Sequence, residues 1–134
     1  MAKKQNYTYA VGKRKTASVR IRLFKGKGES LVNDLPANKY FPGAINKIIL
    51  DRPFNLTETL GKYYFTARVI GSGKEGQLDA VIQGVSKALA LADREKFRSP
   101  LKKAGLLTRD ARIRERRMVG TGGKARRAKQ SPKR

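Results

Sequence analysis

The chain has 134 residues, enough for one domain with a modest core, and it carries a net charge of +22. With no cysteine and no histidine, it lacks disulfides, thiolate metal ligands and the commonest general base. A charge this large opposes the compact state by self-repulsion, so the composition predicts a polyanionic partner, with nucleic acid as the leading candidate.

The positive charge is concentrated at the two ends of the chain. Residues 1–28 hold nine basic side chains and no acid, and residues 109–134 hold eleven against two acids. Residues 29–108, with twelve basic and eight acidic side chains, have the balance of an ordinary domain. Beyond Val119 too little apolar surface remains to offset the entropy of ordering the backbone. We therefore expect a globular domain over residues 1–108 and an extended basic tail over residues 109–134.

Two strands are expected near the N-terminus. Tyr7–Val11 is rich in aromatic and β-branched residues, and Gly12–Thr16 follows as a basic turn. Ala17–Phe24 then alternates, with apolar side chains on one face and Arg20 and Arg22 on the other. This period of two predicts a half-buried strand with a cationic outer face. The two arginines are either solvated strand positions or contacts to the polyanion.

The middle of the chain predicts two further strands and two short helices. Glu29–Val32 is a short third strand between turn signals, and residues 36–40 form a short helix that begins at a proline. Gly43–Leu50 has apolar residues at helical spacing, and Pro53 is expected to end that helix. Lys62–Ile70 is the clearest later strand, with alternate side chains on its two faces.

The strongest helix signal lies at Gln77–Ala92. Its apolar residues recur at steps of three and four and form one stripe: Leu78, Val81, Ile82, Val85, Leu89 and Ala92. Ser99 and Pro100 then supply the N-cap and first position of another helical turn, which Gly105 ends. Together the elements predict an α+β fold: a four-stranded, mainly antiparallel sheet with helices on one face.

Gly71–Gly76 spells G-x-G-x-x-G between a strand and a helix. A dinucleotide-binding fold requires a second parallel strand with an acid at its tip about 20 residues further on. Asp93 has roughly that spacing, but it ends a helix and no strand follows it. The simplest alternative is a turn that packs the helix on the sheet. A third interpretation is a phosphate-binding corner, made by the amides of Gly73 and Gly76 at the start of the helix together with Lys74.

Catalytic and metal-binding patterns are absent from the sequence. The acids are dispersed, the serines have no histidine to activate them, and there is no Walker sequence. No apolar run approaches 18 residues, and the basic N-terminus lacks the apolar region of a secretory signal. We expect a cytosolic protein that is not an enzyme and has no cofactor, metal, membrane partner or small-molecule substrate.

The kind of polyanion follows from the basic and aromatic residues. Aromatic residues are few and lie mostly in predicted core strands, which favours phosphate contacts and shape recognition of folded RNA over base stacking. In residues 109–134 arginine outnumbers lysine eight to three, and its planar fork suits phosphate. If about ten such contacts form, the logarithm of the affinity should fall with the logarithm of the salt concentration with a slope of roughly −7 to −9. A histone-like or nucleoid DNA architectural protein is the alternative that charge alone leaves open.

The reach of the tail supports a large partner. Residues 120–134, fully extended, would span about 50 Å, whereas a domain of about 100 residues has a radius of gyration near 13 Å. A membrane role is disfavoured because Arg112–Val119 lacks the aromatic or leucine-rich face of an interfacial helix.

Four stretches resemble one known family. They are Gly12–Arg20, Gly71–Gln77, Leu101–Arg112, and Lys124–Arg127 together with Ser131–Arg134. They are similar to small-subunit ribosomal protein nine in its bacterial or organellar form, over essentially the whole chain. The resemblance implies a fold like the second domain of ribosomal protein five. It also implies a left-handed βαβ crossover, where the general rule predicts a right-handed one.

The resemblance further implies a structural protein of the small-subunit head, bound to ribosomal RNA near ribosomal proteins ten and fourteen. Its C-terminal tail would reach the P-site tRNA, where Lys133 and Arg134 match the terminal contact. The family commonly has an aromatic residue before its final Ser-Lys-Arg, whereas here Gln130 precedes Ser131 and Pro132. The proline fixes its own φ at about −65° and favours extended geometry before it.

From the charge pattern and the resemblance, the candidate ribosomal-RNA contacts are basic residues at the N-terminal strands, the glycine corner and the tail. They are Lys13, Arg14, Lys15, Arg20, Arg22, Lys74, Arg109, Arg112, Arg114, Arg116, Arg117, Lys124, Arg126, Arg127 and Lys129.

Overall fold

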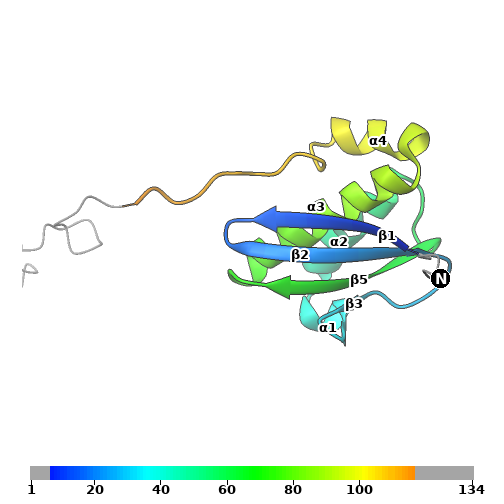
Figure 1. Ribbon diagram of the computed structural model, residues 1–134. Coiled ribbons are helices and arrows are strands. Elements are labelled where there is room, and N and C mark those ends of the chain that lie inside the picture. The colour runs from blue at the N-terminus through cyan, green and yellow to red at the C-terminus, as the bar shows by residue number, and fades with distance from the viewer. Residues whose placement is uncertain (1–6, 117–134) are drawn as a thin grey trace, which may run out of the picture.

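The computed structural model describes residues 7–116, which form a five-stranded mixed sheet and four helices (Figure 1). The strands are β1 Tyr7–Arg14, β2 Ala17–Lys25, β3 Leu31–Val32, β4 Leu35–Pro36 and β5 Tyr63–Ile70. The helices are α1 Ala37–Tyr40, α2 Ala44–Leu56, α3 Lys74–Ala92 and α4 Arg94–Lys103. The strand order is β1-β2-β5-β3-β4, and only the β3–β5 pair is parallel. The predicted α+β class and mainly antiparallel sheet are confirmed.

The prediction of four strands is wrong, because residues 35–36 form a fifth. This short strand pairs back on β3 through the two-residue turn Asn33–Asp34, whose φ angles of 49° and 68° are both positive. Such a turn matches the twist of a hairpin. A two-residue strand is too short to show alternation, and Pro36 was expected to open a helix. Pro36 ends the edge strand, where its missing N–H is tolerated, and as the N-cap of α1 it also opens the predicted short helix through Tyr40.

The first strand is longer than predicted. It extends through the expected basic turn to Arg14, which pairs with Ala17, so the turn shrinks to Lys15 and Thr16. Lys15 has a φ of 53°, as the tight reversal requires. Because alternate residues of a strand face opposite sides, Arg14 falls on the helix side of the sheet, with the buried Gly12.

The boundaries of α2, α3 and α4 also differ from those predicted, and α3 begins at Lys74 rather than Gln77. Helix α2 continues past Pro53 to Leu56, and Pro53 and Phe54 are both buried. Burial of this turn compensates for the hydrogen bond that proline cannot donate. Helix α4 begins at Arg94 rather than Pro100, because the carboxylate of Asp93 caps it by accepting from the amide of Lys96 at 3.2 Å. Ser99 and Pro100 therefore lie inside the helix.

The core lies between the sheet and α3. The predicted apolar stripe of α3 is buried from Leu78 to Leu89, but Ala92 is exposed because it ends the helix at the turn to α4. From the sheet, Val19, Ile21 and Leu23 of β2 face this helix and are at most 2% exposed. The predicted alternation of β2 is confirmed.

A glycine contact brings β1 close to α3. A Cβ on Gly12 would overlap the carbonyl oxygen of Ala80 and lie 2.6 Å from the amide nitrogen of Gly84. Only a residue without a side chain permits two backbones to approach so closely. The position of β1 on the helix is therefore fixed by backbone sterics.

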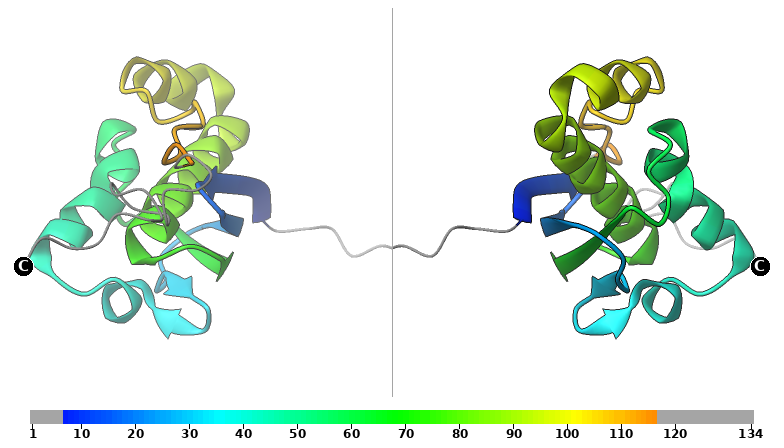
Figure 2. Two further views of the ribbon diagram at one scale, coloured as in Figure 1. Left: turned by 90° about the vertical axis from the view of Figure 1, so that its left-hand side faces the viewer. Right: turned by 90° about the vertical axis from the view of Figure 1, so that its right-hand side faces the viewer.

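The helices of residues 7–116 leave one face of the sheet uncovered. Helix α3 packs across β1 and β2, and α2 and α4 pack against α3 on the same side (Figure 2). The residues that connect the parallel strands β3 and β5 include α1 and α2, and the left-handedness of this crossover stays a prediction. No helix among the described residues has the length and apolar character needed to cross a bilayer.

Candidate nucleic-acid interface

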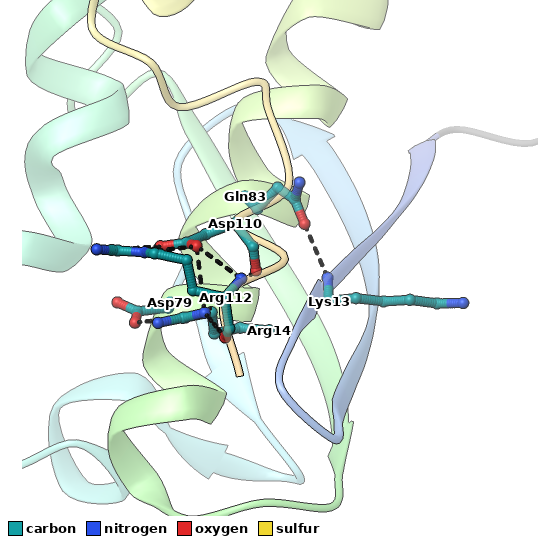
Figure 3. A network of polar contacts seen from close by, with 6 residues as sticks. All are labelled: Lys13, Arg14, Asp79, Gln83, Asp110 and Arg112. Carbon is teal, nitrogen blue, oxygen red and sulfur yellow. Dashed lines mark hydrogen bonds and ion pairs between the residues drawn. The ribbon is translucent and has the colours of Figure 1, made fainter. Parts of the chain in front are cut away.

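Three predicted contact residues, Lys13, Arg14 and Lys15, lie where β1 turns into β2, and two of them are exposed to solvent. Lys13 and Lys15 are exposed, and the side chain of Lys13 points away from the cluster around Arg14 (Figure 3). The main-chain amide of Lys13 donates to Oε1 of the buried Gln83 at 2.9 Å. Helix α3 thus holds the backbone of Lys13, while its side chain is exposed.

Arg14 is placed differently, because its guanidinium joins β1 to α3 and to the start of residues 109–134. Its Nη1 donates to the carbonyl oxygens of Asp110 at 3.2 Å and Arg112 at 2.6 Å. It also pairs with the carboxylates of Asp110 at 3.3 Å and Asp79 at 3.6 Å. We call Arg14, Asp79, Asp110 and Arg112 the Arg14 cluster (Figure 3). The side chain of Arg14 is 13% exposed.

A short ion pair within the cluster orders the backbone at residues 110–112. The Nε of Arg112 donates to the two carboxylate oxygens of Asp110 at 2.9 and 3.0 Å, and the amide of Arg112 donates to Oδ1 at 3.1 Å. The side-chain hydrogen bonds from Arg112, then its amide, hold the pKa of Asp110 well below its usual range. Asp110 in turn raises the pKa of Arg112. At neutral pH both groups are charged.

The predicted residues of β2 lie on the uncovered face. Arg20 and Arg22 are exposed, and neither forms an ion pair with a carboxylate among residues 7–116. Arg22 lies 5.2 Å from the ring centroid of Tyr7, a cation–π contact. Arg14 and Arg20 thus have the same chemistry but different surroundings.

The geometry of the glycine corner, Gly71–Gly76, supports the interpretation as a packing turn more directly than the interpretation as a phosphate site. A Cβ on Gly76 would lie 2.6 Å from the hydroxyl of Ser72, and Gly71 has a φ of 81°. Lys74 is exposed, but its ammonium lies 3.3 Å from the ring centroid of Tyr40 and donates to the carbonyl oxygen of that residue at 3.3 Å. The ammonium group of Lys74 is therefore already in contact with Tyr40. A contact between Lys74 and RNA stays a prediction.

The tail residues divide between those that the structure describes and those beyond it. Arg109, Arg112, Arg114 and Arg116 are exposed and lie in a segment without helix or strand. The other predicted contacts lie outside the described residues: Arg117, Lys124, Arg126, Arg127, Lys129, Lys133 and Arg134.

Sequence reasoning assigned Arg14 to RNA and missed its carboxylate partners Asp79 and Asp110. The available signal was the period of two in β1, since Ala10, Gly12 and Arg14 share one face. Within residues 7–116 no group of three or more acids is arranged to hold a metal ion. The site that the structure presents is a set of exposed cations.

Comparison with known proteins gives a consistent result. The family described as ribosomal protein S9/S16 matches residues 12–134. The small ribosomal subunit protein uS9 of Maridesulfovibrio salexigens is 45% identical over 119 residues, covering 89% of this chain and 91% of that protein. The protein of the same name from Desulfotalea psychrophila is 42% identical over the same shares.

Proposed function

The chain belongs to the S9/S16 family of ribosomal proteins, and on that premise we propose how it binds RNA in the small subunit. As a ribosomal protein of the small subunit it is a structural component of the ribosome and not an enzyme. In our proposal the folded domain docks on ribosomal RNA of the subunit head, next to ribosomal proteins ten and fourteen, as the family resemblance implies. The basic tail, residues 109–134, continues through the RNA.

The exposed cations of the domain carry the proposal for RNA binding. Lys13, Lys15, Arg20 and Arg22 are exposed around one hairpin, on or beside a sheet face that no helix of the described residues covers. Phosphate contacts of this kind position a protein on RNA without reading its sequence. Lys74 at the glycine corner and the arginines at 109, 112, 114 and 116 add charge at two further places.

The proposal for the tail rests on the Arg14 cluster and the terminal charges. The cluster attaches residues 110–112 to the domain, so the tail leaves from a fixed point. Its proposed RNA contacts beyond that point are Arg117, Lys124, Arg126, Arg127 and Lys129. Lys133 and Arg134 then meet phosphates of the P-site tRNA, as the family resemblance implies.

Cosedimentation with small ribosomal subunits tests the first part. The protein should remain bound to the subunits at moderate salt, and its affinity for ribosomal RNA should fall steeply with salt concentration. Absence from the subunit fraction would contradict the proposal. A DNA architectural role instead predicts that duplex DNA displaces folded RNA at equal phosphate concentration.

A terminal deletion tests the contact with tRNA. Removing Lys133 and Arg134 should leave subunit assembly intact and weaken P-site tRNA binding, because two positive charges near phosphate are lost. The variant Lys124→Gln/Arg126→Gln removes the same charge further from the terminus and serves as the matched control. Equal tRNA affinity in the deletion and the full-length protein would remove this role.

A further inference from the structure

The uncovered face of the sheet carries a groove of about 410 Å³ between β2, β5 and the β3–β4 turn. Its charged and aromatic lining consists of Tyr9, Arg20, Arg22, Arg68 and Asp34. We propose that this groove binds the sugar–phosphate backbone of RNA through its three arginines and stacks one base on Tyr9. The proposal rests on the function proposed above and adds Arg68 and Tyr9 to its binding residues.

The strand register brings the three arginines together. Arg20 of β2 lies directly opposite Arg68 of β5, and Arg22 follows two residues along the same face. Residues two apart on one strand are separated by about 6.7 Å. Arginine stays protonated in proteins, so like charges face each other across this pair at every accessible pH. Such a pair opposes folding, and a bound phosphate would relieve it.

One carboxylate is present, and it is well placed to compete with an anionic ligand. Asp34 pairs with Arg68 at 3.1 Å, but the two side chains are 76% and 68% exposed, so solvent screens the pair. The turn that carries Asp34 is fixed, because the side-chain amide of Asn33 donates to Val69 O at 3.1 Å and its oxygen accepts from Val69 N at 2.9 Å. The groove is therefore lined by three positively charged side chains and one negatively charged side chain.

The aromatic residues of the same face limit how many bases can stack. Phe24 stacks on Tyr64 with ring centroids 5.1 Å apart, and Tyr7 packs on the other side of Phe24 at 5.6 Å. Gly28 lies against the ring of Tyr64, where a Cβ would come within 2.8 Å of the ring. These three rings pack against one another and leave less of their faces for a base. Tyr9 is 47% exposed and borders the groove, so one stacked base fits the surface better than a row of bases.

A binding series with transcribed small-subunit ribosomal RNA tests the proposal across a range of salt concentrations. Each of Arg20→Gln, Arg22→Gln and Arg68→Gln should lower affinity about three- to tenfold at low salt and reduce the log–log salt slope by about 0.7–0.9. Tyr9→Ala should lower affinity about fivefold with an unchanged slope, and Tyr9→Phe should restore it, because stacking requires the ring and not the hydroxyl. Arg98→Gln, an exposed arginine of α4 in the helix layer, is the matched control and should bind as the wild type does.

The outcomes separate this site from the broader function. If the wild-type protein binds ribosomal RNA and all three sheet variants match Arg98→Gln in affinity and slope, the groove is not the binding site. If the variants bind isolated RNA normally but are lost from assembled subunits, the face docks a protein, which also overturns the proposal. If the wild-type protein fails to bind at all, the proposed function itself is wrong.

Discussion

Arg14 and Arg20 belong to the same hairpin, and the structure puts them to different uses. Arg14 lies on the helix side of the sheet, 13% exposed, between two carboxylates and two carbonyl oxygens. Arg20 lies on the uncovered side, exposed and opposite another arginine. The guanidinium group of Arg14 is held by intramolecular partners, and that of Arg20 is exposed and available to a ligand.

The difference shows that local charge does not identify a ligand-binding cation. Arg14 has partners in α3 and at residues 110–112, so removing it deprives two carbonyl oxygens and the Asp79 carboxylate of this partner, while Asp110 keeps its hydrogen bonds from Arg112. Removing Arg20 relieves a repulsion. The two positions therefore predict effects on stability of opposite sign, and the following experiments test that contrast.

Substitution of Gly12 should have the largest effect, because it displaces the strand that carries both regions. In Gly12→Ala the new methyl group meets the backbone of Ala80 and Gly84, which cannot move aside without shifting α3. We expect the free energy of unfolding, measured by urea denaturation, to fall by about 3 kcal/mol.

Gly73→Ala is the matched control for that experiment. Among the described residues, no atom beyond the two chain neighbours of Gly73 lies within 4 Å of a Cβ there, and its φ is −96°, so the fall should stay below about 1 kcal/mol. Equal losses in the two variants would show that the close approach of β1 to α3 is not the cause.

Arg14→Gln should lower the free energy of unfolding by about 1–2 kcal/mol, because charge-assisted hydrogen bonds in a largely buried position are lost. It should also release residues 110–116 from the domain. Since the chain has no cysteine, spin labels at Glu115→Cys and Lys96→Cys report this directly. The distance distribution between them should broaden in the variant.

Arg20→Gln provides the contrast. It should change stability by no more than about 0.5 kcal/mol, in the stabilising direction at low salt, and leave the label distances unchanged. If Arg14→Gln and Arg20→Gln behave alike in both measurements, the distinction between the anchored and the available arginine is wrong.

The titration of Asp110 tests the electrostatics of the anchored region. Its folded-state pKa is depressed, so its stabilising contribution is fully present above the unfolded value of about 3.9 and is lost as pH falls through the folded value. The carboxyl carbon resonance, followed by NMR, should therefore titrate well below the ordinary aspartate range. Arg112→Gln removes the main cause and should move the midpoint upward. An ordinary midpoint in the wild type would contradict the hydrogen-bonded pair.

The smallest effect is expected for the exposed pair on the open face. A double-mutant cycle with Asp34→Asn and Arg68→Gln should give a coupling free energy below about 0.5 kcal/mol that weakens with added salt. A coupling above about 1 kcal/mol would mean that Asp34 holds Arg68 as firmly as the Arg14 cluster holds its arginine. Arg68 would then be a poor candidate for RNA binding.

Much of the fold could be predicted because its strongest signals are local. The alternation in Ala17–Phe24 and Lys62–Ile70 and the stripe from Leu78 to Leu89 reflect the fixed repeats of strand and helix. Asp93 was missed as a cap because Ser99 and Pro100 offer a stronger local signal for a helix start. The exposed Ile45 and Ile48 of α2, at 74% and 68%, show that helical spacing of apolar residues does not decide which face is buried.

The sequence by itself determined that this protein carries charge at both ends of an ordinary domain, and therefore that it needs a polyanion. Only the tertiary structure decided which cations remain available for one. Arg14 meets carbonyl groups 96 and 98 residues further along the chain, whereas Arg20 meets Arg68 across two paired strands. The periodicity of a segment reports which side a residue faces. Which groups the residue contacts on that side depends on packing between segments that are distant in sequence.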